Sequence, residues 1–456
     1  MAHGHTATLR PEKLQIGGVS ARLGIPALGV GIVALLFAVR QGAASDELMT
    51  HFFFSYLAAY TFFLAITLGS LIFVLIQYLT RAGWSVTVRR LAEGLSLNVF
   101  LMTVLLIPFF MKFNGVDGVH RLLMWFDGTR SGVNHDEILL SKYGYLNPTF
   151  FAIRLGVCFV YWCWLAWFFA SKSAQQDQDG NPRTSVILDR VAAPCMILLA
   201  FTLTAFVFDW VMSLNPYWFS TIFGVYFFAG AMLSSLSAIV LLAQSLQKRG
   251  LMIGAVNHEH YQDLGKLMFA FTFFWGYIMF GQYMLIWYAN MPEETQFFIP
   301  RQFEAWVSIS LLLLFVHLLI PFPGLLSRHV KRRNKVLAFW AVWSLCACAL
   351  DTYYLVMPNE FIQKIPSAAG NPTMPVTNAL GYLADKHDIY HILPGHDEFV
   401  RQVQFPLQGG SLLITVLCYV GIGGLFVFST MMALKGKSLV PVKDPRLDEA
   451  LAFENI

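Results

Sequence analysis

The sequence predicts an all-α integral membrane protein with ten transmembrane helices, and three observations lead to this prediction. Hydrophobic residues make up 57% of the 456 residues and charged residues only 13%, far from the composition of soluble globular domains. Ten apolar stretches are long enough to cross a bilayer, for which a helix needs about 20 residues. Two of them contain an aspartate, Asp209 and Asp351, each followed at the same distance by a proline, Pro216 and Pro358.

The ten apolar stretches define a membrane domain over residues 23–434, between an N-terminal segment (1–22) and a C-terminal tail (435–456). Because residues 1–22 are polar and the first stretch is itself long enough to span, we expect a membrane helix there rather than a removable signal peptide. The predicted spans are Leu23–Val39, Phe52–Leu79, Leu91–Phe110, Thr149–Ala170, Val191–Leu214, Trp218–Leu246, Leu264–Ala289, Phe303–Leu326, Val336–Val356 and Ser411–Leu434.

The distribution of basic residues predicts the orientation. Most of the 31 Lys and Arg residues fall in the loops and tails on the side of both chain ends, and such loops are normally cytoplasmic. We therefore expect both termini in the cytoplasm. The net charge of +4 follows from this asymmetry and requires no nucleic-acid partner.

Spans 2–5 (about residues 52–214) and spans 6–9 (about residues 218–356) are predicted to be two parallel copies of a four-helix unit, with spans 1 and 10 at the periphery. Pairs of phenylalanines followed by small residues recur in spans 2 and 6, a Pro-x-x-Phe enters spans 4 and 8, and Asp-x6-Pro closes spans 5 and 9. Four crossings preserve direction, so the repeat axis would lie along the membrane normal. Two long loops, residues 111–148 and 357–410, are expected on the periplasmic side, where they suit docking of another protein.

Charged residues within spans are costly unless they are paired, hydrated or functional, so each is a candidate site residue. On the periplasmic side we expect Arg154 to lie at the depth of Asp209, and Glu304 at the depth of Asp351. Arg154 and Asp209 could be a structural ion pair, and the two acids could simply be solvated near the interface. If Glu304 and Asp351 instead lie close together, their two carboxylates would share a proton. We expect Asp351, which lacks an obvious cation, to be protonated more readily than Asp209.

A second group of candidates lies toward the cytoplasmic side: Glu93, Lys266 and His317. His317 is the only histidine predicted deep in the bilayer, and a side chain that titrates near neutral pH suits a proton relay. It could also be an interhelical histidine with a purely structural hydrogen bond, and Glu93 and Lys266 could line the headgroup boundary. If they lie on a proton path, the cytoplasmic-side group would line one half-channel and the periplasmic-side group would line the other.

The sequence offers no ligands for a redox centre of its own. All six cysteines lie within predicted spans, without a haem c motif or an iron–sulfur pattern, and one deep histidine cannot supply a bis-histidine haem. Three histidines in the second long loop, His387, His391 and His396, resemble a metal-ligand cluster, but Pro394 and Gly395 interrupt it. We expect a solvated docking loop there and no bound metal.

Two runs carry a family resemblance: HFFFSYLAAY at residues 51–60 and FDWVMSLNPYWFSTIFGVY at residues 208–226. With the ten spans and the doubled unit, they resemble the smaller of the two large membrane subunits of bacterial alternative complex III. That assembly is a quinol:cytochrome c oxidoreductase, and its membrane subunits are related to the anchors of polysulfide and nitrite reductases.

The resemblance implies partners and a place: a multihaem cytochrome c, an iron–sulfur protein and a sister ten-helix membrane subunit, in a bacterial inner membrane, with a terminal oxidase as a further candidate partner. Haem c and iron–sulfur clusters would belong to the partners, while a quinone such as menaquinone and lipid are candidate ligands of this chain. The sister subunit is the better candidate for quinol oxidation. In this chain His51 and His120 are the histidines available for such a site.

Three functions remain open from the sequence. The leading one is a respiratory-complex subunit that couples quinol oxidation to proton movement. A proton-coupled secondary transporter would also have repeats and buried acids, and a scaffold subunit would have no chemistry of its own.

Overall fold

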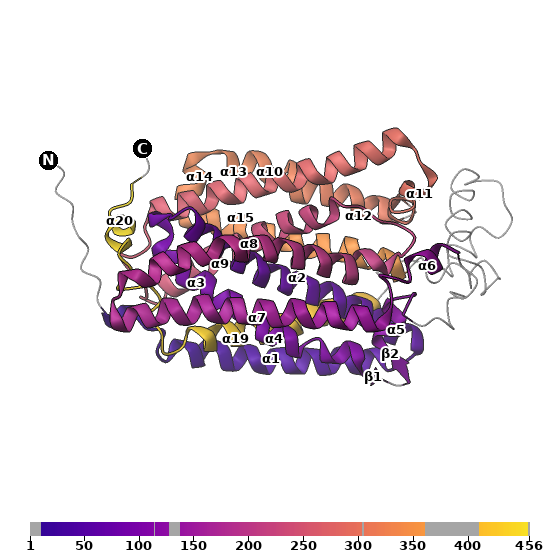
Figure 1. The fold of residues 1–456 in the computed structure, drawn as a ribbon, viewed down its shortest axis with the longest axis horizontal. Helices are drawn as coiled ribbons and strands as arrows, with labels where there is room; N and C mark the ends of the chain where they lie inside the picture. The colour runs from indigo at the N-terminus through magenta and orange to yellow at the C-terminus, as the bar shows by residue number, and fades with distance from the viewer. Residues whose placement is uncertain (1–10, 114, 127–136, 303–304, 361–409, 455–456) are drawn as a thin grey trace.

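The computed structural model describes residues 11–113, 115–126, 137–302, 305–360 and 410–454. Ten helices in these segments are long and apolar enough to cross a membrane, and they run side by side as one bundle (Figure 1). The predicted all-α, ten-span fold is confirmed. The first and last described segments, residues 11–18 and 435–454, lie at one end of the bundle, called here the terminal end, whereas α6 (Glu137–Lys142) and α11 (Pro292–Thr295) lie at the opposite, far end (Figure 1).

Eight of the ten spans are continuous helices. They are α1 (Val19–Gly42), α2 (Asp46–Leu79), α7 (Pro148–Asp179), α8 (Pro182–Trp210), α9 (Phe223–Gln247), α10 (His258–Ala289), α15 (Asn334–Val356) and α19 (Gly410–Leu434). The second of these, α2, is buried along almost its whole length.

The third and eighth spans are interrupted, which the apolar stretches did not indicate. The third consists of η2 (Gly83–Ser85), α3 (Val86–Ser96), α4 (Val99–Val104) and η3 (Ile107–Phe110). The eighth consists of α12 (Ala305–Leu313), the π-helical turn η7 (Leu314–Leu319) and α13 (Pro321–Leu326). A π turn inside a helix is uncommon and frequently marks a functional position.

Short elements connect the spans. They are η1 (Pro11–Leu14), β1 (Lys112–Phe113), β2 (Val116–Asp117), α5 (Gly118–Leu122), η5 (Met212–Leu214), η6 (Ile299–Gln302), α14 (Arg328–Arg332) and α20 (Leu447–Leu451). The two strands pair antiparallel in a small hairpin at the far end. Most of the second long loop, which contains His387, His391 and His396, lies outside the described residues.

Asparagine caps fix the starts of three spans. The Asn147 side chain accepts a hydrogen bond from the backbone N–H of Phe150 at 2.8 Å, and Pro148 occupies the first turn of α7. Asn181 and Asn257 cap α8 and α10 in the same way. Because these caps satisfy donors that a helix start leaves free, they set the register in which the following side chains face the bundle.

The centre of the bundle is the contact between α2 and α9, the first helices of the two predicted repeats. Gly69 allows this close approach, since a Cβ atom there would collide with the carbonyl group of Ala231. Each central helix also packs against helices of both halves: α2 against α3, α8 and α15, and α9 against α10, α15 and α8. Two parallel repeats would produce such contacts between the halves. The duplication itself stays a prediction.

The first and last spans form a pair at the edge of the bundle, with α1 largely exposed. Their backbones approach closely at glycines: a Cβ atom on Gly31 would lie 2.8 Å from the carbonyl oxygen of Gly421. Such contacts between small residues are typical of helices that associate within a membrane. The glycine cluster of the last span therefore serves helix packing.

The tails close the terminal end. The backbone N–H of Leu439 donates to the carbonyl of Leu14 at 2.7 Å, and that of Met252 donates to Lys13 at 2.9 Å. The two ends of the chain thus bind each other and the loop between α9 and α10. Residues 11–18 and 435–454 are parts of the folded unit.

Candidate functional site

Asp209 forms an ion pair with Arg154 near the far end of α8. The guanidinium group is bidentate, with Nε donating to Oδ2 at 2.7 Å and Nη2 donating to Oδ1 at 2.8 Å. The third guanidinium nitrogen donates to the carbonyl of Tyr145 at 3.0 Å. The pairing that their common depth predicts is confirmed, and its geometry is the strong, planar form of an arginine–carboxylate contact.

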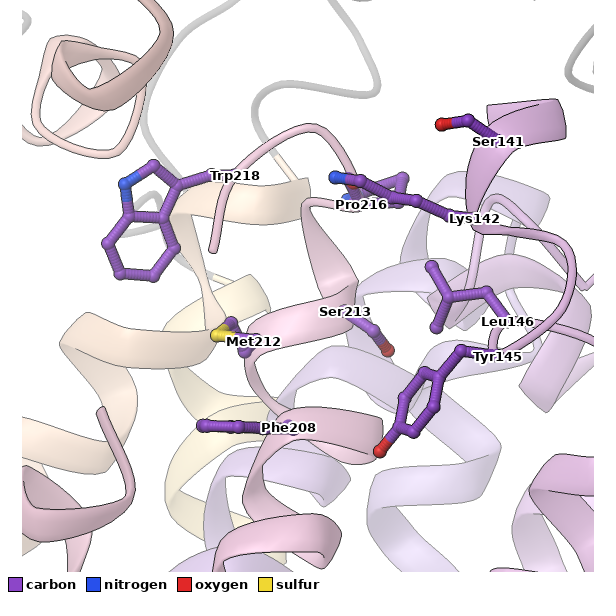
Figure 2. Close-up of a pocket in the computed structure, with 9 residues that line it drawn as sticks. All are labelled: Ser141, Lys142, Tyr145, Leu146, Phe208, Met212, Ser213, Pro216 and Trp218. Atoms are coloured by element: carbon purple, nitrogen blue, oxygen red, sulfur yellow. The ribbon is translucent and has the colours of Figure 1, made fainter. Parts of the chain in front are cut away.

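A small pocket of about 190 Å³ lies beside this ion pair. Figure 2 shows Tyr145 and Leu146 on one side and Met212 and Trp218 on the other. The Lys142 ammonium group donates to the carbonyl of Pro216, the proline of the first Asp-x6-Pro motif, at 2.6 Å. Tyr145 lies outside the spans, and burial together with the negative charge of Asp209 raises the pKa of its hydroxyl to about 12. The pocket thus presents a neutral phenol and an engaged lysine.

Asp351, the aspartate of the second Asp-x6-Pro motif, lies in a different environment, within the last two turns of α15. It is 4% exposed and accepts hydrogen bonds from the hydroxyl of Tyr226 and from Nε1 of Trp275, the latter at 3.2 Å. Within the described part of the chain, no Lys, Arg or His nitrogen lies within 4.0 Å of its carboxylate. The carboxyl group is therefore held by two neutral donors in the interior of the bundle. Glu304, its predicted acidic neighbour, lies outside the described residues.

His317 lies next to the Asp351 site, on the π turn η7. Its ring stacks on Trp275 with a centroid distance of 3.6 Å, and its Nε2 lies 3.8 Å from the sulfur of Cys348, one helical turn before Asp351. The ring is fully buried, and Nδ1 makes no hydrogen bond to the described residues. We predicted His317 in one group with Glu93 and Lys266; the structure groups it with Asp351 instead, because the π turn directs it at Trp275.

In the predicted repeat, the two aspartates have different residues at the position of Arg154. Counted from Pro148 and Pro300, the position of Arg154 corresponds to Trp306. Trp306 is buried and stacks on Tyr353 of α15, with ring centroids 5.9 Å apart. Where the first half of the chain has a cation, the second half thus has an aromatic ring.

Glu93 belongs to a buried ionic cluster at the terminal end. Its carboxylate lies 3.0 Å from Nε of Arg90 and 3.6 Å from Nε of Arg89. Arg90 also binds Asp177 at 2.8 Å, and Arg89 binds Asp444 of the C-terminal tail at 2.5 Å. This cluster ties α3 to α7 and to the tail, which gives Glu93 a structural role beside the predicted one.

Lys266 does not join Glu93. Its side chain is 48% exposed and pairs with Asp263 one turn earlier, at 2.8 Å. Near it, burial lowers the pKa of Lys331, and the charge of Lys266 contributes to that shift. The cytoplasmic group predicted from sequence is therefore three separate sites in the structure: Glu93 with arginines, Lys266 at the surface and His317 beside Asp351.

An apolar groove runs along the contact between the last span and the two halves of the bundle. It has a volume of about 620 Å³. Among its lining residues are Phe62 and Phe63 of α2, Leu242 of α9, Ala349 of α15 and Tyr419 of α19.

No group of three or more His, Cys, Asp or Glu side chains among the described residues is arranged to hold a metal ion.

Sequence reasoning missed the partners of Asp351 and one further buried pair. Tyr226 and Trp275 had no distinguishing pattern, because aromatic residues fill every span. The resemblance implies His51 only as a histidine available for a quinol site; in the structure it binds Glu360, which follows α15, at 2.8 Å. His120 packs against Phe126 instead, with ring centroids 5.1 Å apart. A histidine directly before one predicted span and an acid four residues after another were the available signals.

The fold and these buried polar sites define the chain as an integral, multi-pass membrane protein. No protein-family model matches the sequence, and no curated protein is significantly similar to it.

Proposed function

We propose that this chain is a proton-conducting membrane subunit of a respiratory quinol:cytochrome c oxidoreductase of the alternative complex III type. The observation that carries the proton-conducting role is Asp351: a carboxyl group buried in a span and held by Tyr226 and Trp275 without a cation. Such a group is costly to keep charged, and neutral donors allow it to exist with or without its proton. An acid in this setting suits reversible proton binding.

His317 supports the same role from the side of the terminal end. Its ring contacts Trp275, which in turn binds Asp351, so two titratable side chains lie on one short route through the second half of the bundle. By contrast, the Arg154–Asp209 pair is fully engaged and suits a fixed element of the first half. We propose Asp351 and His317 as proton carriers, with Glu304 as a further candidate, and Arg154, Asp209, Glu93 and Lys266 as the charged groups that frame the route.

The respiratory assignment rests on the resemblance of residues 51–60 and 208–226, and it supplies the partners. We propose that a multihaem cytochrome c, an iron–sulfur protein and a sister membrane subunit carry the redox centres, with a terminal oxidase as acceptor. Both termini would face the cytoplasm of a bacterium. The apolar groove of about 620 Å³ would hold a hydrocarbon chain, from a lipid or from the tail of menaquinone.

Purification in mild detergent tests this assignment. Covalently bound haem c should co-migrate with the chain on a native gel, and an iron–sulfur protein should be present at equal amounts. A haem-free oligomer made of this chain alone would contradict it and would favour a secondary transporter. The interrupted third and eighth spans are the structural feature that such a transporter would use.

A scaffold without chemistry is distinguished by mutation. In the intact complex, Asp351→Asn should leave quinol oxidation measurable and remove its coupling to proton movement. Unchanged coupling in this variant would favour the scaffold. The exposed variant Lys112→Gln, whose side chain is 72% exposed in an ion pair with Asp117, serves as the control.

A further inference from the structure

A second buried acid–base pair lies at the far end of the bundle, apart from both aspartates. His51 of α2 and Glu360 are 3% and 2% exposed, and Nδ1 of the imidazole lies 2.8 Å from the Glu360 carboxylate. The other ring nitrogen, Nε2, faces the carbonyl oxygen of Ser411 at 3.0 Å and the hydroxyls of Ser55 and Thr415 at 3.2 and 3.3 Å. Both nitrogens of the ring therefore have partners.

We propose that His51 and Glu360 form a proton-binding site that exchanges protons with Asp351 along α19. This inference rests on the proposed proton conduction and adds to it the place where the proton is held on the far side of Asp351. The ligand is the proton itself.

The partners of the ring can serve it in two protonation states. In the loaded state, Nδ1–H donates to Glu360 and Nε2–H donates to the carbonyl of Ser411, so the pair has no net charge. When Nε2 loses its proton, the Ser55 hydroxyl can turn to donate to Nε2, and the Thr415 hydroxyl, 3.3 Å from the Ser411 carbonyl, can donate to that oxygen. Hydroxyls act as donor or acceptor as needed. In both states each ring nitrogen of His51 has a hydrogen-bond partner, and a ring nitrogen without one would be an energetic obstacle to a buried titratable site.

The charged and titratable groups around the pair lie on the side of Glu360 rather than around Nε2 of His51. The charge of Glu360 acts on Tyr353 of α15, a neutral phenol. Arg301 marks the same end of α15, bound by the carbonyls of Tyr354 and Leu355, whereas α2 and α19 face His51 with the hydroxyls already named. The ring nitrogen that releases the proton thus faces neutral groups, and the carboxylate holds the other nitrogen.

Polar side chains lie in series between the pair and Thr352, the residue that follows Asp351. Thr352, the next residue, shares a hydrogen bond of 2.9 Å with the hydroxyl of Tyr419. Tyr419 follows Thr415 by four residues and so lies on the same face of α19, one turn of about 5.4 Å along the helix. Thr415 binds Ser55 at 2.8 Å, which binds His51. The hydrogen-bonded segments Thr352–Tyr419 and Thr415–Ser55–His51 leave two steps in the route, one between Tyr419 and Thr415 and one between Asp351 and Thr352, and a bridging water can mediate each of them.

The proton balance of the step is simple. Asp351 in its carboxylic acid form releases a proton and becomes a carboxylate, and Nε2 of His51 accepts one proton from the other end of the route. The charge of the His51–Glu360 pair changes from −1 to zero. Release of that proton to the far side returns the pair to its starting state.

The test uses the intact complex in proteoliposomes and compares native protein with His51→Asn, Asp351→Asn and the exposed control His329→Asn. Infrared difference spectra between about pH 5 and about pH 8 should contain an imidazole transition coupled to a carboxylate band. Both should vanish in His51→Asn and persist in Asp351→Asn and His329→Asn. Proton flux driven by a potassium diffusion potential should fall about tenfold in His51→Asn and in Asp351→Asn.

Two outcomes separate this inference from the proposed function. If His51→Asn conducts like the native complex while Asp351→Asn does not, the inference is overturned and the proposed function stands. If the coupled transition disappears in His51→Asn but Asp351→Asn conducts normally, the proton-binding pair stands and the proposed function falls. Ser55→Ala covers the case in which His51→Asn fails to fold: it removes the donor of the proton-free ring, so the loaded state should be favoured and the transition should shift. An unshifted transition contradicts the inference.

Discussion

Asp209 in α8 and Asp351 in α15 belong to the same sequence motif, Asp-x6-Pro, yet the structure surrounds them differently. Asp209 receives two charge-assisted hydrogen bonds from Arg154. Asp351 receives one hydrogen bond from a phenol and one from an indole. A positive partner favours the ionised carboxylate, whereas burial among neutral donors disfavours it. One copy of the motif is therefore suited to hold two helices together, and the other to bind and release a proton.

In the predicted repeat, the position that corresponds to Arg154 differs between the two halves of the chain. An aromatic ring at that position, Trp306, supplies no counter-ion for Asp351 and stacks on Tyr353 instead. The uncompensated acid is then accommodated by donors from α9 and α10, while the ion pair of the first half needs only α7 and α8. The comparison predicts that stability depends on the first site and proton transfer on the second.

The largest expected effect is the loss of Arg154. Arg154→Met leaves the buried carboxylate of Asp209 without its cation, and breaking a buried pair from one side typically lowers stability by about 3–5 kcal/mol. Thermal unfolding in detergent should detect this as a large fall in midpoint. Lys112→Met, which breaks the exposed pair with Asp117, should change it little; equal effects of the two variants would contradict the ion-pair assignment.

Asp444 in the C-terminal tail is a second carboxylate with cationic partners. It tests, outside the membrane, whether a positive partner favours the ionised form of a buried carboxylate. Burial alone would raise the pKa of Asp444, but Arg89 and Arg446 lower it below the ordinary value of 3.8. A carboxyl group whose pKa is depressed in the folded state stabilises that state fully above its ordinary pKa, and this contribution is lost as the pH falls through the depressed value.

The tail should therefore stay bound at neutral pH and come loose only at acid pH, with a loss of about 2 kcal/mol, the usual contribution of hydrogen bonds to a charged group. Pepsin cleavage of residues 435–454 measured at falling pH reports this release. Asp444→Asn should make the tail sensitive to protease already at neutral pH, with a neutral protease as the probe. The exposed Asp448→Asn is the control, and equal protection of both variants would rule out the role of Asp444.

Removal of one neutral donor should have a smaller effect. Tyr226→Phe deletes one of the two hydrogen bonds to Asp351, which corresponds to about 1 kcal/mol in stability. The carbonyl-stretch band of protonated Asp351 should move to higher frequency, since that group loses a hydrogen bond. Phe227→Leu, on the same helix, should leave the band in place.

The smallest change in stability is expected for Asp351→Asn. An amide can still accept hydrogen bonds from Tyr226 and Trp275, so the unfolding midpoint should stay close to that of the native protein. Asp209→Asn removes a negative charge from beside Arg154 and should be the more destabilising of the two. If Asp351→Asn destabilised the protein more than Asp209→Asn, this would contradict the structural role of the Asp209 site.

The sequence was sufficient for the spans and for the Arg154–Asp209 pair, because hydropathy and helix direction together determine depth. It could not predict which helix faces approach one another. Tyr226 and Asp351 are hydrogen-bonded between α9 and α15, and His51 meets Glu360 from the opposite end of the chain; such contacts depend on helix rotation, which aromatic-rich spans do not encode visibly. Glu93 was correctly placed near one end, but its arginine partners become evident only when α3 packs against α7 and the tail.

The most direct test of the difference between the two aspartates is an infrared titration of their carbonyl-stretch bands, assigned with Asp209→Asn and Asp351→Asn. As the pH is lowered, the band of Asp351 should appear first, and that of Asp209 only under more acidic conditions, since Arg154 must lose its partner. Appearance of the Asp209 band before that of Asp351 would contradict the assignment of the ion pair to structure and of Asp351 to proton binding.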